Sequence, residues 1–526
     1  MSKRILNNTL FGLLLMLSFP SCRPLSLNNP GDFDSKSNLQ TRLFQLFLQS
    51  LMPPVIPPQC PVRSTPWTSP KIGSGNTTVR IHNVITLNNG DVAIIGNTLE
   101  TLPNMPIHKN TGFIGTQRNV FLLVLSIETG EFKWVDYLGE TLTSDSGNRS
   151  YIAKFSNGDI AVVHSTTAGA DGISGAISGK ASNVIPSVFV ARYSADGERK
   201  WHTYLDSARF LGESLLTINS EEQIHIFASI NSNTTSYDPF GEFPAPLNSA
   251  FNTPSQNVRD FIHAKLSGDG SPIAQAFVGS SSSSEEFFRS VASDASGVYL
   301  IGTSQGNING SGFGTNPASG YSRPFVAKFK NDLSTEWVRY PGAGSATNDY
   351  SGIDLSPVKD GILAWSTTYE TFGSPTHPYV GPGLNHALTK YSTTGAMSWN
   401  YFLGYGSNNV EIPFGLPYLQ LAGSDTLYSY GYGSSGGTRY SGFSTLESGT
   451  TSNPYPIALK KVNGATGTIE KINYSENLAS PSLKAIQQFT QSCSGLLISG
   501  QSTLPDTAQN SKVYANIIAL PKESLP

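Results

Sequence analysis

Phe325-Val326-Ala327-Lys328-Phe329, followed by Asn331-Asp332 and then by Trp337, is the stretch that decides the fold. It predicts a short buried strand, a tight turn and a second strand. The same order of residue types, an aromatic or aliphatic residue, Val or Ile, Ala, Lys or Arg, and Tyr or Phe, recurs along the chain with variations. Its seven copies begin at Phe121, Val188, Phe261, Phe325, Ala387, Ile457 and Asn516. A unit repeated in this way indicates a repeat architecture rather than several unrelated domains.

A further β-rich segment, often opened by a turn glycine, precedes each copy. The seven such segments begin at Gly90, Gly158, Gln223, Gly297, Gly361, Thr426 and Gly495. Each repeat thus holds four short antiparallel strands. The first precedes the glycine turn, the second follows it, the third carries the Phe-Val-Ala-Lys-Phe pattern, and the fourth often begins at the Trp. Four-stranded repeats of this kind are typical of propeller blades. We therefore predict an all-β fold, a seven-bladed β-propeller of four-stranded antiparallel blades over residues 65–526.

The last repeat ends after its third strand, near Leu520. Trp67-Thr-Ser-Pro-Lys-Ile-Gly73 resembles the fourth strand Trp134-Val-Asp-Tyr-Leu-Gly139 with one residue inserted. We expect this N-terminal strand to complete the last blade. Such closure would remove the exposed edges of an open array.

The repeats resemble the β-propeller repeats known as SBBP repeats of bacterial envelope and secreted proteins. Phe325 to Phe329, Trp399 with Phe402-Leu-Gly404, and Gly297-Val-Tyr-Leu-Ile-Gly302-Thr303 carry the resemblance, which covers about residues 65 to 526. It implies the propeller architecture. That family has no set of catalytic residues, so the resemblance implies no activity.

The N-terminus is expected to be a lipoprotein signal over residues 1–21. Lys3 and Arg4 precede an apolar run that ends at Phe19, too short for a spanning helix. Ser21 stands directly before Cys22, which we predict to be lipidated, in a looser box similar to those of spirochaete-type lipoproteins. Ordinary cleavage with an incidental cysteine is the alternative. This predicts a lipid-anchored protein of the cell envelope, at the outer membrane or cell surface.

Residues 22–64 are expected to form a tether with one short amphipathic helix. Within 35–52, leucine and phenylalanine recur at helical spacing before Pro53-Pro54. This helix either packs on the main domain or binds a membrane surface or partner. Cys60 and Cys493 would both fall at one rim of the last blade, so we predict a disulfide between them, with two free thiols as the alternative.

Charge argues against nucleic acid as a partner. Charged residues are 13% of the chain and the net charge is -3, which gives no phosphate-binding field. We expect a monomeric propeller whose partners are a membrane, through the lipid, and a protein or glycan ligand.

The connections between second and third strands are long, and in a propeller they leave one face. They are rich in Gly, Ser, Asn and Thr with interspersed aromatic residues, a mixture similar to that of adaptable binding loops. Small local cores inside the loops are the alternative explanation for these rings. The aromatic residues predicted to bind a ligand are Tyr237, Phe240, Phe243, Phe313, Tyr321, Tyr379, Tyr440 and Phe443.

No catalytic residue, metal ligand or cofactor site is predicted. Gly302-Thr-Ser-Gln-Gly306 and Gly433-Ser-Ser-Gly-Gly437 match a nucleophile elbow by letter only, because no helical pattern follows either. The favoured function is a non-catalytic envelope lipoprotein that binds a macromolecule or glycan. A periplasmic envelope-assembly scaffold and a propeller enzyme, a lyase or a quinoprotein-like oxidoreductase, are the alternatives; Thr129-Gly130 with Trp134 is similar to quinoprotein blade repeats.

Overall fold

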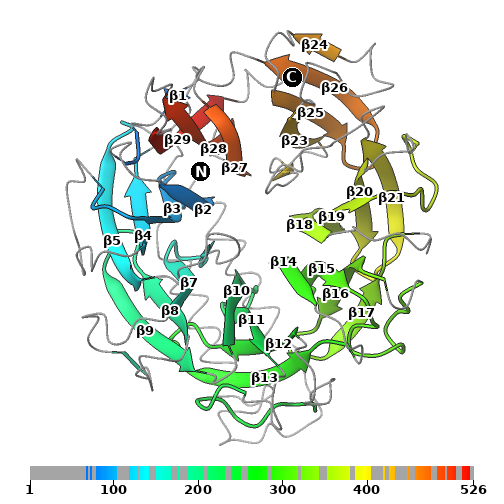
Figure 1. Ribbon diagram of the computed structural model, residues 1–526, viewed down its shortest axis with the longest axis horizontal. Coiled ribbons are helices and arrows are strands. Elements are labelled where there is room, and N and C mark those ends of the chain that lie inside the picture. Colours follow the sequence, from blue (N-terminus) through cyan, green and yellow to red (C-terminus); the bar gives the residue numbers. More distant parts are fainter. Residues whose placement is uncertain are drawn as a thin grey trace, which may run out of the picture. The chain divides into compact units, whose positions relative to one another are not determined.

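Each repeat of the sequence folds into one antiparallel sheet in the computed structural model (Figure 1). The chain divides into two units, Met1–Gln59 and Cys60–Pro526, and all described residues belong to the second. The structure describes residues 67–68, 71–73, 79–102, 118–126, 129–140, 150–166, 176–177, 187–206, 210–231, 239–249, 259–280, 286–317, 321–342, 352–378, 385–403, 419–420, 426–432, 447–449, 457–475, 483–491, 495–504 and 512–521.

Six sheets have four strands, and in five of them the strands are hydrogen-bonded in chain order. The first four of these sheets are β2 (Arg80–Thr86), β3 (Val92–Thr98), β4 (Asn119–Leu125) and β5 (Phe132–Glu140); β6 (Tyr151–Lys154), β7 (Ile160–Thr166), β8 (Ser187–Tyr193) and β9 (Arg199–Asp206); β10 (Phe210–Ile218), β11 (Ile224–Asn231), β12 (Arg259–Leu266) and β13 (Pro272–Val278); and β14 (Phe287–Asp294), β15 (Gly297–Ser304), β16 (Arg323–Phe329) and β17 (Thr335–Arg339).

The fifth sheet continues this order, and the last sheet departs from it in one strand. The fifth is β18 (Gly352–Val358), β19 (Gly361–Thr368), β20 (Asn385–Ser392) and β21 (Met397–Leu403). The last holds β27 (Leu483–Gln491), β28 (Gly495–Leu504) and β29 (Lys512–Pro521), and its fourth strand is β1 (Trp67–Thr68) from the start of the unit. Trp67 pairs with Ala519 and Thr68 with Ile518, as the match between Trp67 and Trp134 predicted.

The sixth sheet has five strands where four were expected. It contains β22 (Leu419–Gln420), β23 (Thr426–Tyr432), β25 (Ile457–Asn463) and β26 (Ile469–Ser475). The additional strand β24 (Glu447–Gly449) comes from the long connection between β23 and β25 and pairs in parallel with β26. Three residues without alternation gave no strand signal in the sequence.

The second and third strands form the core. β3, β7, β15 and β19 are buried at every residue, and so are β4 and β16. Strands covered on both faces contain continuous apolar runs, and this explains the low charge content. The first strands pack side by side in chain order, and β2 of the first sheet also contacts β27 of the last (Figure 1).

All regular elements of the described residues are strands. Within those residues, no helix is long and apolar enough to cross a membrane. The expected lipidation site Cys22, the helix of 35–52, and the cysteine pair Cys60 and Cys493 all lie outside the described residues.

Candidate functional site

Every sheet has two ends that differ in their connections. Because the strands alternate in direction, the first-to-second and third-to-fourth turns leave at one end, here the turn face, and the second-to-third connections leave at the other, here the loop face. The strand bounds confirm long second-to-third connections in the first six sheets, whereas in the last sheet β28 ends at Leu504 and β29 already begins at Lys512. In the fourth sheet, for example, the loop runs from Ser304 to Arg323, whereas Asp294 and Gly297 bound the turn between the first and second strands.

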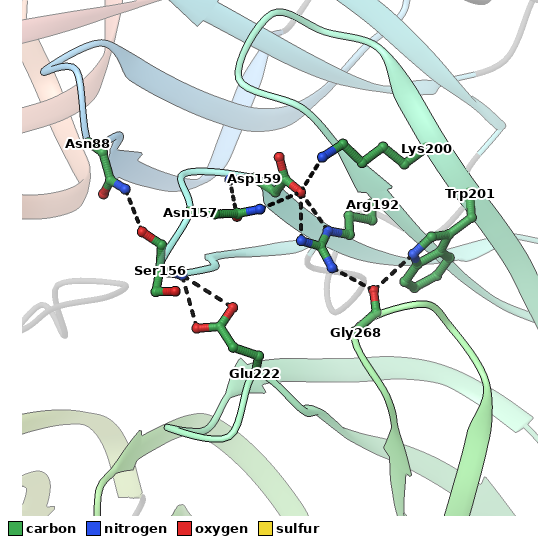
Figure 2. Close-up of polar contacts among 9 residues, drawn as sticks. All are labelled: Asn88, Ser156, Asn157, Asp159, Arg192, Lys200, Trp201, Glu222 and Gly268. Atoms are coloured by element: carbon green, nitrogen blue, oxygen red, sulfur yellow. Dashed lines mark hydrogen bonds and ion pairs between the residues drawn. The ribbon is translucent and has the colours of Figure 1, made fainter. Parts of the chain in front are cut away.

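Hydrogen bonds on the turn face join the inner turns of three successive sheets (Figure 2). Asn88 Nδ2 donates to the carbonyl oxygen of Ser156 at 2.7 Å. The backbone N–H of Ser156 donates in turn to Glu222 Oε1 at 3.1 Å. Glu222 has a positive φ of 61°, and its carboxylate points toward Ser156 of the neighbouring sheet (Figure 2).

An ionic cluster lies beside these turns, between the second and third sheets (Figure 2). Asp159 Oδ2 lies 2.6 Å from both Arg192 Nη2 and Lys200 Nζ. Burial acts to raise the pKa of Asp159, but hydrogen bonds from Lys200, Asn157 and Arg192 outweigh it and the pKa lies below its ordinary value. The carboxylate therefore stays ionised. It binds the Arg192 guanidinium, which reaches Gly268 of the next sheet.

One backbone carbonyl in the third-to-fourth turn of a sheet accepts donors from the sheet before it. Gly268 O receives Arg192 Nη1 at 2.7 Å and Trp201 Nε1 at 3.0 Å (Figure 2). The arrangement recurs along the chain: Trp134 to Ala195 O, Lys265 to Asn331 O, Lys328 and Trp337 to Thr393 O, and Lys390 and Trp399 to Gly464 O. The Lys and Trp of the repeated motif thus join neighbouring sheets, and a ligand-binding role is not needed to explain them.

The described parts of the loops lie along the fourth strands of their own sheets. Their backbone groups extend the sheet: Ile177 N–H to His202 O, Leu247 N–H to Gln275 O, Val338 N–H to Phe313 O, and Thr376 N–H to Asn400 O. β24 does the same on β26. Edge strands carry unpaired backbone groups that invite association with other chains, and these loops cover them.

Four of the predicted binding aromatics lie in described loops. Phe240 is fully buried and Phe243 nearly so, with ring centroids 5.9 Å apart, and both belong to the hydrophobic core that strands of the second and third sheets form, so they are not exposed to a partner in this fold. Phe313 and Tyr321 are exposed at 38% and 36%. Tyr237, Tyr379, Tyr440 and Phe443 lie outside the described residues.

A cluster that the sequence did not reveal lies at the loop face between the third and fourth sheets. Arg259, at the start of β12, has its Cζ 4.9 Å from the ring centroid of Phe287 on β14. Arg289, two residues further along β14, has its Cζ 5.7 Å from the same ring. Arg289 is exposed, and Phe287 and Arg259 are half-buried. We name these three residues the Arg–Phe–Arg cluster.

Two buried carboxyl groups adjoin this cluster in the sequence. Asp260 and Glu286 are both fully buried, and the Ser280 and Ser304 hydroxyls donate to Glu286 Oε1. Burial is the largest effect on Glu286 and raises its pKa well above the ordinary value. The charge of Asp260 also raises this pKa, and the hydrogen bonds from Ser280 and Ser304 offset these effects only in part. Burial therefore favours the neutral form of Glu286. Without exposed surface it cannot reach a substrate as a general acid in this conformation.

The signal for the cluster was present but weak. An arginine stands two residues before the phenylalanine of the third strand in two successive repeats, Arg259 before Phe261 and Arg323 before Phe325. Arg323 is fully buried near Glu370, with 3.6 Å between Nη1 and Oε1. Arg259 instead meets Phe287. Only the packing of the next sheet distinguishes the two positions.

Two histidines on neighbouring strands, His225 on β11 and His263 on β12, lie in the interior. Asn219 Oδ1 accepts the backbone N–H groups of Glu221 and Gln223, so Nδ2 is the donor to His225 Nε2. His225 Nδ1 then donates to His263 Nε2 at 2.9 Å, and the His263 ring stacks on Phe227 with centroids 4.0 Å apart. Burial lowers the pKa of both rings, so both are neutral.

Metal-binding groups do not gather in the part of the chain that the structure describes: no three His, Cys, Asp or Glu side chains there are placed to hold an ion together.

Comparison with known proteins identifies no family for the chain. No family model matches the chain, and no curated protein matches it in sequence. A polysaccharide lyase of family PL25, an ulvan lyase, is similar in structure with 8% identity and a TM-score of 0.44, over 85% of this chain and 95% of its own. A complex of BBS1N with ARL6DN gives 9% and 0.36, over 88% and 99%. Acylaminoacyl peptidase of Pyrococcus horikoshii gives 9% and 0.36, over 83% and 51%.

These similarities are too distant to carry an activity. The observed architecture is an all-β, propeller-like series of repeated antiparallel sheets, six of them four-stranded.

Proposed function

We propose that residues 65–526 form a closed seven-bladed propeller. Support comes from the seven sheets, from the pairing of β1 with β29, and from the contact between β2 and β27. In this arrangement the last blade takes its fourth strand from the start of the unit, and each blade has a neighbour on both sides.

The propeller is proposed to act as a binding module of a cell-envelope lipoprotein. Lipidation of Cys22 attaches the chain to a membrane, and residues 22–64 act as the tether. The loop face binds a macromolecule or glycan without catalysis. Exposed side chains in the described parts of this face include Phe313, Tyr321, Ile177, Leu247 and Arg289.

The difference between the two faces carries this proposal. On the turn face, hydrogen bonds between successive sheets use the polar groups of the turns (Figure 2). The loop face collects all the long connections and an exposed arginine on an inner strand. Binding residues are disproportionately found on loops held by a rigid scaffold.

The face can be tested by attaching a bulky polymer at one engineered azide-bearing residue. Ser311 lies in an exposed loop-face connection, and Asp332 is its matched control on the turn face. The polymer-modified full chains are displayed on cells and incubated with biotinylated envelope proteins and with an array of acidic and neutral glycans. Loss of capture for the Ser311 conjugate alone supports the loop face, and equal capture by both conjugates would exclude it.

Location is tested separately. Metabolic labelling with a clickable fatty acid should mark the wild-type chain and not Cys22→Ala. Protease added to intact cells should cleave the propeller if it is displayed at the surface. Protection from protease would favour the alternative, a periplasmic assembly scaffold.

A further inference from the structure

We infer that Asn463 is a site of self-catalysed deamidation, in which the backbone nitrogen of Gly464 attacks the side-chain amide of Asn463. The two residues lie where β25 ends and the turn to β26 begins. Asparagine followed by glycine favours this reaction, because glycine has no side chain to hinder closure of the five-membered ring. The inference concerns a modification site and does not depend on the proposed binding function.

The sequence contains four Asn-Gly pairs, and the structure describes each of them. Their asparagines are Asn89, Asn157, Asn309 and Asn463. In the first three pairs the glycine N–H, whose nitrogen would have to attack, already donates a hydrogen bond. The acceptors are the carbonyl oxygens of Leu87, Phe155 and Asn307. Removing the proton would also cost this hydrogen bond, so these three pairs are protected.

The fourth pair lacks this protection. The N–H of Gly464 has no acceptor among the described residues, although Gly464 is buried. A buried N–H is nearly always paired in a folded protein, so this group stands out. Its nitrogen can lose the proton without losing a hydrogen bond.

Backbone N–H groups surround the oxygen that becomes negative in the reaction. Asn463 Oδ1 accepts Ala465 N–H at 3.0 Å and Thr466 N–H at 3.1 Å. In the other three pairs the asparagine Oδ1 accepts one backbone N–H each. When nitrogen adds to the amide carbon, Oδ1 takes up the negative charge, and two donors already aimed at this atom stabilise it.

A glutamate fixes the other end of the amide. Asn463 Nδ2 donates to Glu470 Oε1 at 3.4 Å, and Glu470 Oε2 lies 3.6 Å from Lys461 Nζ. The amide therefore keeps its oxygen toward the two N–H groups. Asn463 is half-buried and Ala465 is exposed, so water and hydroxide can reach the amide from the open side of the turn.

The reaction balances with water as the only co-reactant. Hydroxide removes the proton of the Gly464 nitrogen, whose electron pair forms a bond to Cγ of Asn463. The bond from Cγ to Nδ2 breaks, and Nδ2 takes a proton from water and leaves as ammonia. Water then opens one of the two C–N bonds of the resulting succinimide, which leaves aspartate or isoaspartate at position 463.

The modification would act on a contact between two sheets. Gly464 O accepts Lys390 Nζ at 3.2 Å and Trp399 Nε1 at 3.1 Å, both from the fifth sheet. Isoaspartate adds one methylene to the main chain directly before Gly464, so its carbonyl moves away from these donors. We therefore expect the contact between the fifth and sixth sheets to weaken as the protein ages.

The experiment incubates the folded full chain in mildly alkaline buffer and follows all four pairs by peptide mass spectrometry. Position 463 should convert roughly tenfold faster than each of the other three, because its oxygen has a second donor and its glycine N–H has no competing acceptor. Labelling by isoaspartate methyltransferase identifies the isoaspartate product. In urea, where the fold is lost, the four pairs should convert at similar rates.

Gly464→Ala is the matched variant. The φ of Gly464 is not positive, so alanine fits the backbone, while its methyl group hinders ring closure. Conversion at position 463 should slow by a similar factor and stay unchanged at the other three pairs. Long incubation should lower the unfolding midpoint of the wild-type chain and leave that of Gly464→Ala unaffected.

Two results would overturn the inference. One is conversion in the folded wild-type chain that is no faster at position 463 than at the other three pairs, a comparison that holds even if the variant folds poorly. The other is a folded Gly464→Ala chain that converts as fast as wild type. Conversion without any change in the unfolding midpoint would reject the effect on the contact between the sheets.

Discussion

Gly395 shows why a turn residue in this repeat cannot be exchanged freely. It has a φ of +81°, in the left-handed region, and a Cβ added there would lie 2.7 Å from Cδ2 of Trp337 in the preceding sheet. Gly467 meets Trp399 in the same way. The turn glycine of one sheet therefore packs directly against the motif tryptophan of the preceding sheet.

Gly395→Ala should lower the free energy of unfolding by about 1 to 2 kcal/mol through the left-handed backbone and by about 1 to 3 kcal/mol more through overlap with Trp337. Gly310→Ala is the matched control, since Gly310 has a φ of +95° and nothing within 4 Å of the added Cβ. Urea unfolding measures both variants. Equal losses would show that the ring of Trp337 yields without cost.

Buried histidines make stability depend on pH. Burial lowers the pKa of His164 to about 4, that of His225, with help from Lys265, to about 3, and that of His386, with help from Lys460, to about 3. His263 is lowered as well. Below pH 6.5 the unfolded chain binds protons that the folded chain does not, so folding stability is present above this pH and is lost as the pH falls toward 4.

Glu286 opposes this effect with one proton, because its raised pKa makes the folded chain bind the proton. A net uptake of about three protons corresponds to a slope of at most about 4 kcal/mol per pH unit. His164→Gln should reduce the slope by about one proton whatever it does to stability at pH 7. Chemical unfolding between pH 4 and 7 measures this, and an unchanged slope would mean that His164 is protonated in the fold.

At the scale of elements, the sequence predicted the strands that carry a repeated motif and missed those that do not. The third strands and the tryptophan-bearing fourth strands lie where their motifs placed them, because alternation and turn glycines are local signals. β24 and the loop segments at Ile177 and Leu247 were not predicted, since each makes only a few backbone hydrogen bonds to a distant strand.

The candidate site was harder to predict for the same reason. The aromatic residues of the loops can be identified from the sequence. Whether each ring is buried, as in Phe240, or exposed, as in Phe313, depends on how its loop folds back on its sheet. The Arg–Phe–Arg cluster combines residues of two sheets, and no local spacing encodes that combination.

Paired donors to one carbonyl should show coupling between elements. Lys390 Nζ and Trp399 Nε1 donate to Gly464 O at 3.2 and 3.1 Å, and Gly464 is buried. Lys390→Met or Trp399→Phe alone should cost about 1 kcal/mol, because one donor remains. The double variant should lose more than the sum, since the buried carbonyl then lacks both. A double-mutant cycle by urea unfolding measures this, and simple additivity would count against shared acceptance.

At the scale of the whole molecule, the last sheet depends on a short strand. β1 pairs with β29 through only two residues, Trp67 and Thr68. A pairing of two residues supplies few backbone hydrogen bonds, so the pairing itself holds the strand only weakly. A covalent link just before this strand would keep it near β29, and that is the role proposed for Cys60 and Cys493.

A bridge between these cysteines would enclose more than 400 residues, and in the loop-entropy model it would stabilise the fold by about 4 kcal/mol or more. A reductant should then lower the unfolding midpoint of the wild-type chain and leave Cys493→Ser unchanged, with free thiols appearing only after reduction. A chain beginning at residue 70 should lose the same stabilisation together with that of β1, whereas a chain beginning at residue 60 should keep both. If reductant had no effect on the wild-type chain, closure would rest on strand pairing alone, and the truncation at residue 70 would then measure that pairing directly.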